Sequence, residues 1–208
     1  MIAEHAAEAI PGLPGPLPQG ERILWQGKPE WRTLARTAFH TRIVAGYFAV
    51  LTLAAAIGSG GSAFGTAMTA LSGIAAVALL SLLAWGTARG AVYTLTDKRL
   101  VLRIGMALPK CINLPLPLVD AVDLHARAAG SGDIALTVRG TQALGYVALW
   151  PHARPWKLAR PQPMLRSIAD AEHVGAMLAR LCLTANPHGQ LRQAEPLQPQ
   201  LFGEAAAA

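Results

Sequence analysis

Residues 43–88 read IVAGYFAVLTLAAAIGSGGSAFGTAMTALSGIAAVALLSLLAWGTA and decide the fold, because these 46 consecutive residues contain no Asp, Glu, Lys, Arg or His. An apolar run of about 20 residues crosses a bilayer once as a helix, so this length allows two passes. Residues 58–62, GSGGS, break the run with residues that favour turns. The stretch therefore predicts a transmembrane helical hairpin with spans at about 40–57 and 64–86, which excludes a fully soluble domain.

The charges on either side of this block predict its orientation. Arg32, Arg36 and Arg42 precede the first span, Arg89 follows the second, and the GSGGS loop has no charge. Lys and Arg remain on the cytoplasmic side of a membrane, so both termini are expected to be cytoplasmic. The three arginines before the first span are also candidates for contact with anionic lipid, although setting the topology is their plainer explanation.

Small residues within the second span are candidates for helix packing. Gly65, Thr69 and Gly73 follow one another at intervals of four, which places them on one helix face. Small residues at this spacing let two helix backbones approach closely. The partner helix could be the first span of the same hairpin or a helix of another chain, and a homodimer would be one such arrangement.

The overall composition averages the uncharged block at 43–88 and two flanks that contain all the charged residues. The chain is 52% apolar and 14% charged, with a formal net charge of +6 and a pI near 9.9. The basic balance does not indicate nucleic-acid binding, because no Arg/Lys-rich helix, zinc pattern or RNA-binding aromatic signature is found. Cys111 and Cys182 form no CxxC or Cys/His cluster. GxSxG, P-loop, GxGxxG and HExxH motifs are also missing, so we expect neither an enzyme nor a cofactor or metal site.

The chain after the hairpin is rich in strand signals. Two β-rich runs, 91–96 and 99–104, are separated by Asp97-Lys98, which has the position and composition of a tight turn. Further strands are predicted at 110–114, 119–124, 133–138 and 145–150. From Asp170 onward, apolar residues recur on one face of a predicted amphipathic helix, namely Val174, Met177, Leu178, Leu181 and Cys182. An antiparallel sheet or barrel closed by one terminal helix is the pleckstrin-homology-like (PH-like) plan.

The predicted domain organisation follows from these segments. Residues 1–20 form a Pro-rich disordered tail, and residues 21–42 form a cytoplasmic juxtamembrane segment. The hairpin occupies residues 43–88 and is followed by a mainly-β PH-like domain at 89–185. Residues 186–208 are expected to be a second disordered tail.

Two short motifs resemble those of bacterial PH-like domains. Residues 93–101, YTLTDKRLV, resemble the Y-x-(L/V)-T-(D/N)-x-R-(L/I) hairpin of these proteins, which often follows a transmembrane hairpin. Residues 20–29, GERILWQGKP, are similar to the segment that opens many of them. The motif residues are Tyr93, Thr96, Asp97 and Arg99. We expect Arg99 to pair locally with Asp97 and Thr96 to bond the turn backbone, which would set the strand register.

The order of the whole chain resembles the PuhB family of photosynthetic complex assembly proteins of purple phototrophic bacteria. The resemblance covers residues 20 to about 185, with matches at 132–136, 150–156 and 163–166. It implies a non-catalytic factor in the bacterial inner (intracytoplasmic) membrane. Its partners would be reaction-centre and core light-harvesting subunits. The alternative is a general membrane-anchored PH-like module that binds lipid or another membrane protein.

Residues 150–163, WPHARPWKLARPQP, combine two Trp, several cationic side chains and four Pro. The prolines exclude a central strand or a regular helix. Trp and Arg dominate binding hot spots, and Trp also prefers the headgroup level of a membrane. The candidates for partner or membrane contact are Trp150, His152, Arg154, Trp156, Lys157 and Arg160. The segment could equally be a connector into the last helix, with both Trp covering the sheet.

Overall fold

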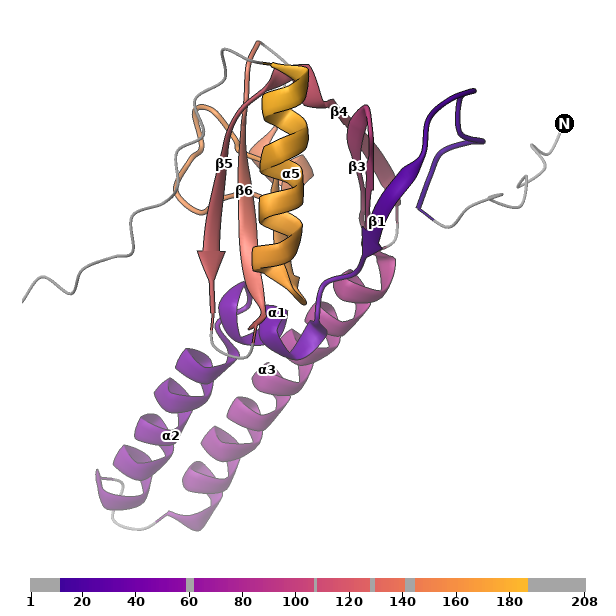
Figure 1. Ribbon diagram of the computed structural model, residues 1–208. Helices are drawn as coiled ribbons and strands as arrows, with labels where there is room; N and C mark the ends of the chain where they lie inside the picture. The colour runs from indigo at the N-terminus through magenta and orange to yellow at the C-terminus, as the bar shows by residue number, and fades with distance from the viewer. Residues whose placement is uncertain (1–11, 59–61, 107, 128–129, 141–144, 187–208) are drawn as a thin grey trace, which may run out of the picture.

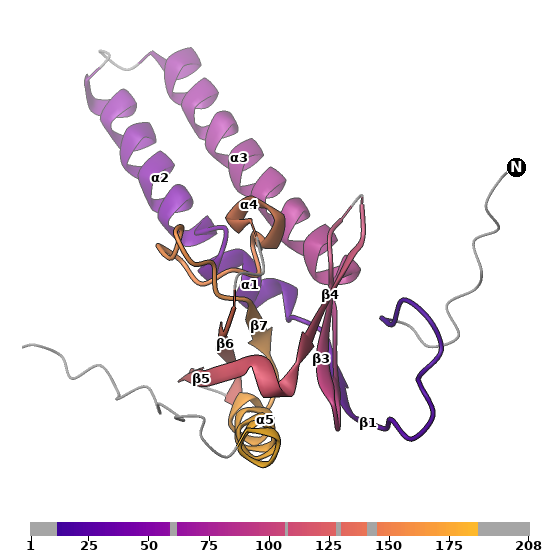
Figure 2. The same cartoon turned by 90° about the horizontal axis from the view of Figure 1, so that it is seen from above.

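Two apolar helices extend from one end of the protein. The computed structural model describes residues 12–58, 62–106, 108–127, 130–140 and 145–186. Helices α2 (Thr41–Gly58) and α3 (Ala63–Gly90) run side by side (Figures 1 and 2). Both are long and apolar enough to cross a membrane. The predicted spans are therefore found as helices, and the turn residues 59–61 lie outside the described part of the chain.

The rest of the described chain forms a mainly-β domain of two antiparallel sheets and a covering helix. The four-stranded sheet has the order β1 (Ile23–Gly27), β2 (Val92–Thr96), β3 (Arg99–Ile104) and β4 (Lys110–Pro115). The three-stranded sheet has the order β5 (Val119–Ala126), β6 (Gly132–Val138) and β7 (Met164–Ile168). A short 3-10 helix, Leu116–Leu118, connects the two sheets. Helix α5 (Ala171–Ala185) packs over β5 and β6 (Figure 1).

The hydrophobic core lies between the sheets and α5. All five residues of β2 are buried, and Leu100 and Leu102 of β3 are fully buried beside them. Helix α5 contributes Val174, Leu178 and Cys182 to this cluster, as its apolar periodicity predicts. The helix closes the core as the PH-like plan requires.

One predicted strand is wrong. Residues 145–150 do not form a strand, because Tyr146–Leu149 is the short helix α4. Tyr146 and Leu149 both pack toward the core, whereas Val147 between them is exposed. A spacing of three between the inward side chains matches a helical turn and not the alternation of a strand.

The domain begins much earlier than residue 89. Strand β1 pairs with β2, with Gln26 opposite Thr94 and Gly27 opposite Tyr93, so the predicted juxtamembrane segment supplies an edge strand. The predicted tail is also partly ordered, because Leu13 is buried and a Cβ on Gly12 would overlap Val92. The other residues expected to be disordered, 1–11 and 187–208, lie outside the described part of the chain.

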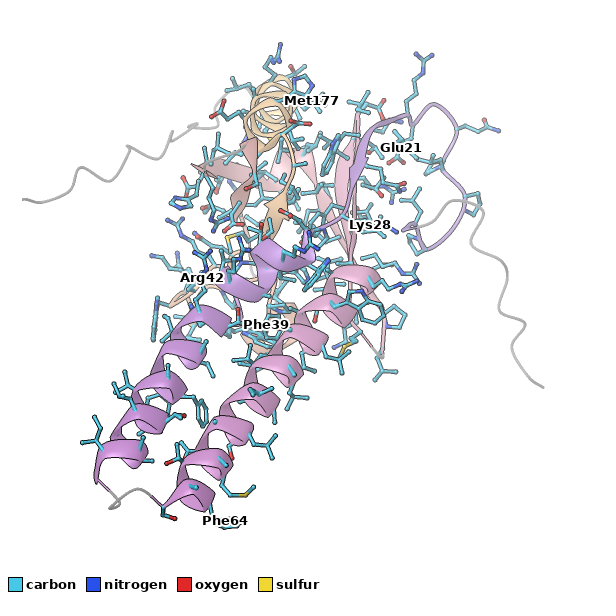
Figure 3. The ribbon with its side chains drawn as sticks, turned by 90° about the horizontal axis from the view of Figure 1, so that it is seen from below. Glu21, Lys28, Phe39, Arg42, Phe64 and Met177 are labelled. Carbon is cyan, nitrogen blue, oxygen red and sulfur yellow. The ribbon has the colours of Figure 1, made fainter. Side chains whose placement is uncertain are left out.

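Helix α1 (Trp31–Thr37) joins the domain to the base of the hairpin. Leu34, Ala35 and Phe39 form a second small core with Ala84 and Ala88 of α3. The backbone N–H of Glu30, just before α1, donates to the carbonyl oxygen of Ser167 in β7 at 2.7 Å. Figure 3 shows Arg42 at the domain end of α2 and Phe64 at the far end of the hairpin.

Candidate functional site

The β2–β3 turn forms as the motif predicts. The hydroxyl of Thr96 accepts hydrogen bonds from the backbone N–H groups of Lys98 at 3.3 Å and Arg99 at 3.0 Å. The same hydroxyl donates to the carbonyl oxygen of Arg99 at 2.9 Å. Thr96 therefore closes the turn and stabilises the strand register.

The expected pair between Arg99 and Asp97 is wrong. The Arg99 guanidinium instead donates to both carboxylate oxygens of Glu21, at 2.7 Å from Nε and 3.0 Å from Nη2. Asp97 accepts a hydrogen bond from the backbone N–H of Arg22 at 3.0 Å. The two motifs that resemble PH-like domains thus meet in space and hold β1 to the β2–β3 hairpin. Their role is structural.

Glu21 is almost completely buried, with 2% of its side chain exposed. Burial alone would raise the pKa of its carboxyl group, but hydrogen bonding by Arg99 and Thr96, together with the positive charge of Arg99, outweighs it. The pKa of Glu21 is therefore below its usual range, and the carboxylate remains ionised within its pair with Arg99.

Tyr93 and His152 form a buried polar pair. The Tyr93 hydroxyl lies 2.6 Å from His152 Nδ1, and both side chains are fully buried. The backbone N–H of Arg166 donates to the same hydroxyl at 3.2 Å. These partners leave the hydroxyl hydrogen available for Nδ1. His152 therefore cannot contact a partner or a membrane as predicted, because it packs inside the domain.

Burial changes the acid–base behaviour of His152. Loss of hydration, with a smaller contribution from the positive charge of Arg166, lowers the pKa of His152 to about 3. Its Nε2 has no hydrogen-bond partner among the described residues. A charged imidazole at this position would be both buried and unpaired, so the ring is neutral near pH 7.

Sequence reasoning missed further members of this buried polar group. The Arg166 guanidinium donates to the carbonyl oxygen of Pro151 at 3.0 Å. Asp133 accepts from the backbone N–H of Ser167 at 2.7 Å and from the side chain of Arg127. Burial would raise the pKa of Asp133, but these hydrogen bonds hold it below its usual range. The only sequence signal was that Asp133 and Arg166 fall in stretches that resemble the PuhB family.

The segment after Pro151 forms a loop with a fixed base. Ala153 and Pro163 form a β-bridge, and the backbone N–H of Arg154 donates to the carbonyl oxygen of Gln162 at 2.9 Å. The Arg154 guanidinium bonds the carboxylate of Asp123 and the side chain of Gln162. Arg154 was a candidate for partner contact, but it clamps the loop onto β5.

Residues 155–161 project beyond the contacts of Arg154 with Asp123 and Gln162. We call this segment the 155–161 loop. Trp156 is 92% exposed and Leu158 is 64% exposed, while Lys157 and Arg160 lie beside them in solvent. Trp156 has φ of 64°, in the left-handed region that a bulky residue rarely adopts. The loop therefore presents a large apolar ring and two cations to water from a firm base.

Trp150 lies apart from this loop. Its ring packs edge-on against Phe39, with the ring centroids 5.3 Å apart. Phe39 belongs to the small core at the base of the hairpin. The two Trp of the predicted strip therefore do not cover the sheet together. Trp150 contacts the hairpin base, and Trp156 contacts solvent.

The three arginines expected near lipid are all exposed. Arg32 and Arg36 are on α1, and Arg42 is at the start of α2. The Arg32 guanidinium lies 5.3 Å from the ring centroid of Trp31. The structure places these charges at the domain end of the hairpin, where a membrane surface would lie if the hairpin spans a bilayer.

The predicted small-residue face contributes to packing within the hairpin. Gly73 is buried, and a Cβ at this position would lie 2.6 Å from the Cβ of Phe48 on α2. Thr69 is half-buried and donates its hydroxyl to the carbonyl oxygen of Gly65 at 3.0 Å. Only Ser62 Oγ, at 3.7 Å, would lie near a Cβ on Gly65. Gly73 is thus the close-contact position of the three.

No group of three or more His, Cys, Asp or Glu side chains suited to a metal ion occurs in the described part of the chain. An open surface pocket of about 600 Å³ is lined by Arg127, Gly130, Asp170, Glu172 and His173 near the start of α5. Its Arg127 is already bonded to Asp133. The 155–161 loop is the better candidate for binding.

Comparisons with known proteins match most of the chain. Residues 43–181 match a family model described as bacterial PH domain, which takes in both apolar helices and most of the β domain. A protein of Rhodobacter capsulatus, described as an uncharacterized 23.7 kDa protein in the puhA 5′ region, is 42% identical over 180 residues. The aligned region covers 83% of this chain and 84% of that relative. No solved structure matches.

Proposed function

We propose a function for this chain, which belongs to the bacterial PH domain family. It is a non-catalytic, membrane-anchored factor that assists assembly of the photosynthetic reaction centre with its core light-harvesting antenna. The puhA-region relative hints at a photosynthetic context and supports this proposal. The resemblance of residues 20 to about 185 to the PuhB family supports it as well.

The exposure of Trp156 in the 155–161 loop is the main observation that supports a binding role. Burying an exposed Trp ring against a partner removes a large apolar area from water. Lys157 and Arg160 would add attraction to an acidic surface beside the ring. The clamp at Arg154 means that little backbone freedom is lost on binding, which favours affinity. The proposed partner surface is an apolar patch with acidic residues on a reaction-centre or core-antenna subunit.

The chemistry of the exposed loop supports binding over catalysis. Residues 155–161 contain Pro, Trp, Lys, Leu, Ala and Arg, and they include no carboxylate, histidine, serine or cysteine. The perturbed groups Tyr93, His152 and Asp133 are buried and bonded to neighbours in the domain. A substrate would not reach them without opening the core.

In this proposal α2 and α3 span the bacterial inner membrane and both termini are cytoplasmic. The exposed Arg32, Arg36 and Arg42 would then face anionic headgroups at the cytoplasmic surface. The outward face of α2 includes Gly46, and nothing lies within 4 Å of a Cβ built there. A second copy could dock on this face and form a homodimer. Crosslinking in membranes that yields only monomer would contradict the dimer.

Deletion of the protein should lower the amounts of reaction centre and core antenna without changing pigment synthesis. The double substitution of Leu158→Ala and Arg160→Ala should lower both complexes to a smaller extent, because it removes one of the two exposed apolar side chains and one of the two cations of the loop. The matched control is Leu183→Ala with Arg180→Ala, an exposed Leu and Arg on α5. Near-infrared absorption of isolated membranes measures both complexes.

The general lipid- or protein-binding module remains the alternative. It predicts normal complex levels in the deletion strain, together with loss of some other membrane interaction. Normal reaction-centre and antenna levels after deletion would therefore contradict the assembly role. Equal losses in the loop variant and the α5 variant would contradict the assignment of binding to the loop.

A further inference from the structure

The turn between β3 and β4 exposes two large apolar side chains. Leu108 is 79% exposed and Met106 is 54% exposed, and Lys110 beside them is also exposed. Single exposed apolar residues are common on protein surfaces and need no partner. The position of this turn against α3 distinguishes it from such cases.

Two glycines of α3 allow the turn to lie directly on the helix. A Cβ at Gly86 would overlap the sulfur of Met106, and a Cβ at Gly90 would overlap the carbonyl oxygen of Gly105. Gly105 itself has φ of 118°, which few other residues could adopt. The β3–β4 turn is therefore fitted to the last turns of α3, and Figure 2 shows these strands beside the end of that helix.

The length of α3 indicates the depth of this contact in a bilayer. The helix has 28 residues, about 42 Å at 1.5 Å per residue, whereas about 20 residues cross the hydrocarbon core. Counting from Ala63, the core would end near Leu82. Trp85 follows at the headgroup level that Trp prefers, with the Arg89 guanidinium 4.9 Å from its ring centroid. Gly86 and the β3–β4 turn lie at the same level.

We propose that Met106 and Leu108 insert into the cytoplasmic interfacial layer of the same bilayer that holds α2 and α3. This inference rests on the proposed membrane anchoring and deepens it. The exposed Arg89 and Lys110 lie close by and would face anionic headgroups. The turn gives the β domain a membrane contact besides the two spans. It limits how far the domain can tilt and so holds the 155–161 loop at a fixed orientation to the membrane.

Nitroxide labels on the full-length protein in vesicles test this inference. A Cys111→Ser background removes the exposed thiol, and Cys182 can stay because it is buried and its pKa is raised to about 11. A label is placed at Leu108→Cys in vesicles of phosphatidylcholine and phosphatidylglycerol. Leu82→Cys, exposed on α3, is the lipid reference, and Ala176→Cys, exposed on α5, is the water reference. Collision rates with oxygen and with a water-soluble nickel chelate report the depth of each label.

The label at position 108 should show an oxygen-to-nickel collision ratio several-fold higher than the label at 176. A ratio at 108 equal to that at 176, with the label at 82 still in lipid, overturns this inference alone. If the label at 82 is also in water, the membrane anchoring fails with it. Spin–spin broadening at 108 that is lost on dilution with unlabelled protein would identify a second copy as the occupant, which also overturns the inference.

Discussion

At the residue scale, the ion pair of Glu21 and Arg99 joins segments that are 78 positions apart in the chain. The Glu21 side chain is almost wholly buried, so its charge depends on Arg99 for compensation. Removing one partner of such a pair is far more destabilising than replacing both, because a lone buried charge remains. The pair therefore holds β1 against the β2–β3 hairpin.

The substitution Arg99→Met should lower the free energy of unfolding by about 3 kcal/mol, because it leaves the Glu21 carboxylate buried and unpaired. Urea unfolding of the full-length protein in detergent micelles, followed by tryptophan fluorescence, measures the change. The double variant Glu21→Met/Arg99→Met should recover most of the loss.

The control for this prediction is Arg139→Met, which breaks an exposed pair with Asp120. Exposed pairs contribute at most about 1 kcal/mol, so this variant should remain close to the parent protein. Similar losses in the Arg99 and Arg139 variants would show that burial of Glu21 does not decide the stability of the domain.

His152 predicts a pH dependence of stability. Its folded-state pKa of about 3 lies below the value near 6.5 expected in the unfolded chain. The unfolded state therefore binds the proton more readily. The contribution of neutral His152 to the free energy of unfolding is fully present above about pH 6.5. It is lost as the pH falls toward 3, by about 1.4 kcal/mol per pH unit. Between pH 6.5 and 5 the protein should lose about 2 kcal/mol.

The substitution His152→Gln should remove this pH dependence of the free energy of unfolding. Gln can still accept a hydrogen bond from the Tyr93 hydroxyl, but it cannot take up a proton. The exposed His173→Gln on α5 is the control and should keep the slope. Urea unfolding from pH 7.5 to 5 measures both variants. An unchanged slope in His152→Gln would mean that other groups control the acid response.

At the element scale, Gly73 determines how closely α2 and α3 pack. Replacing Gly73 by Ala adds a Cβ that overlaps Phe48, whereas the same change at Gly65 meets only an ordinary contact. Gly73 lies in the helix interior, where Ala gains the most helix propensity over Gly, whereas Gly65 lies in the first turn of α3, so differences in propensity do not explain a loss at Gly73. Gly73→Ala should therefore be less stable than Gly65→Ala by about 1–3 kcal/mol.

Thermal unfolding in detergent micelles measures this difference. The double variant Gly73→Ala/Phe48→Ala should recover only the part of the loss that comes from the ring, because the Cβ of residue 48, which lies nearest to the added Cβ, is still present. Equal midpoints for Gly73→Ala and Gly65→Ala would contradict close packing of the hairpin at Gly73.

Local patterns predicted some elements well and others badly. The two apolar helices, the β2–β3 turn and the buried face of α5 all follow from periodicity or turn chemistry within a short window. Strand β1 was missed because it is a five-residue edge strand whose partner is about 70 positions away. Helix α4 was predicted as a strand because a segment of four residues is too short to distinguish the helical period of 3.6 residues from the strand period of two.

At the scale of the whole molecule, α1 and the hairpin base connect the β domain to the two apolar helices. Leu34, Phe39 and Ala84 pack together there, and Trp150 adds its ring against Phe39. The start of the 150–163 strip is therefore tied to the helices, while its tip carries the exposed Trp156. This arrangement would fix the direction in which a membrane-anchored protein presents the loop.

The candidate site was only partly predictable from the sequence. Trp, Arg and Pro marked residues 150–163 as unusual, and the exposed Trp156, Lys157 and Arg160 agree with a binding surface. Composition could not separate these from His152, which is buried against Tyr93, or from Arg154, which bonds Asp123, because both contacts join segments far apart in the chain. Only the folded arrangement shows which cationic or aromatic side chain reaches solvent.

Site-specific photo-crosslinking tests the central proposal most directly. A benzophenone amino acid replaces Trp156 in cells that are assembling the photosynthetic complex, and the same amino acid at the exposed Leu183 of α5 is the control. The proposal predicts that position 156, and not position 183, forms adducts with a reaction-centre or core-antenna subunit. Adducts from 156 that include no such subunit, or identical subunit adducts from both positions, would contradict it.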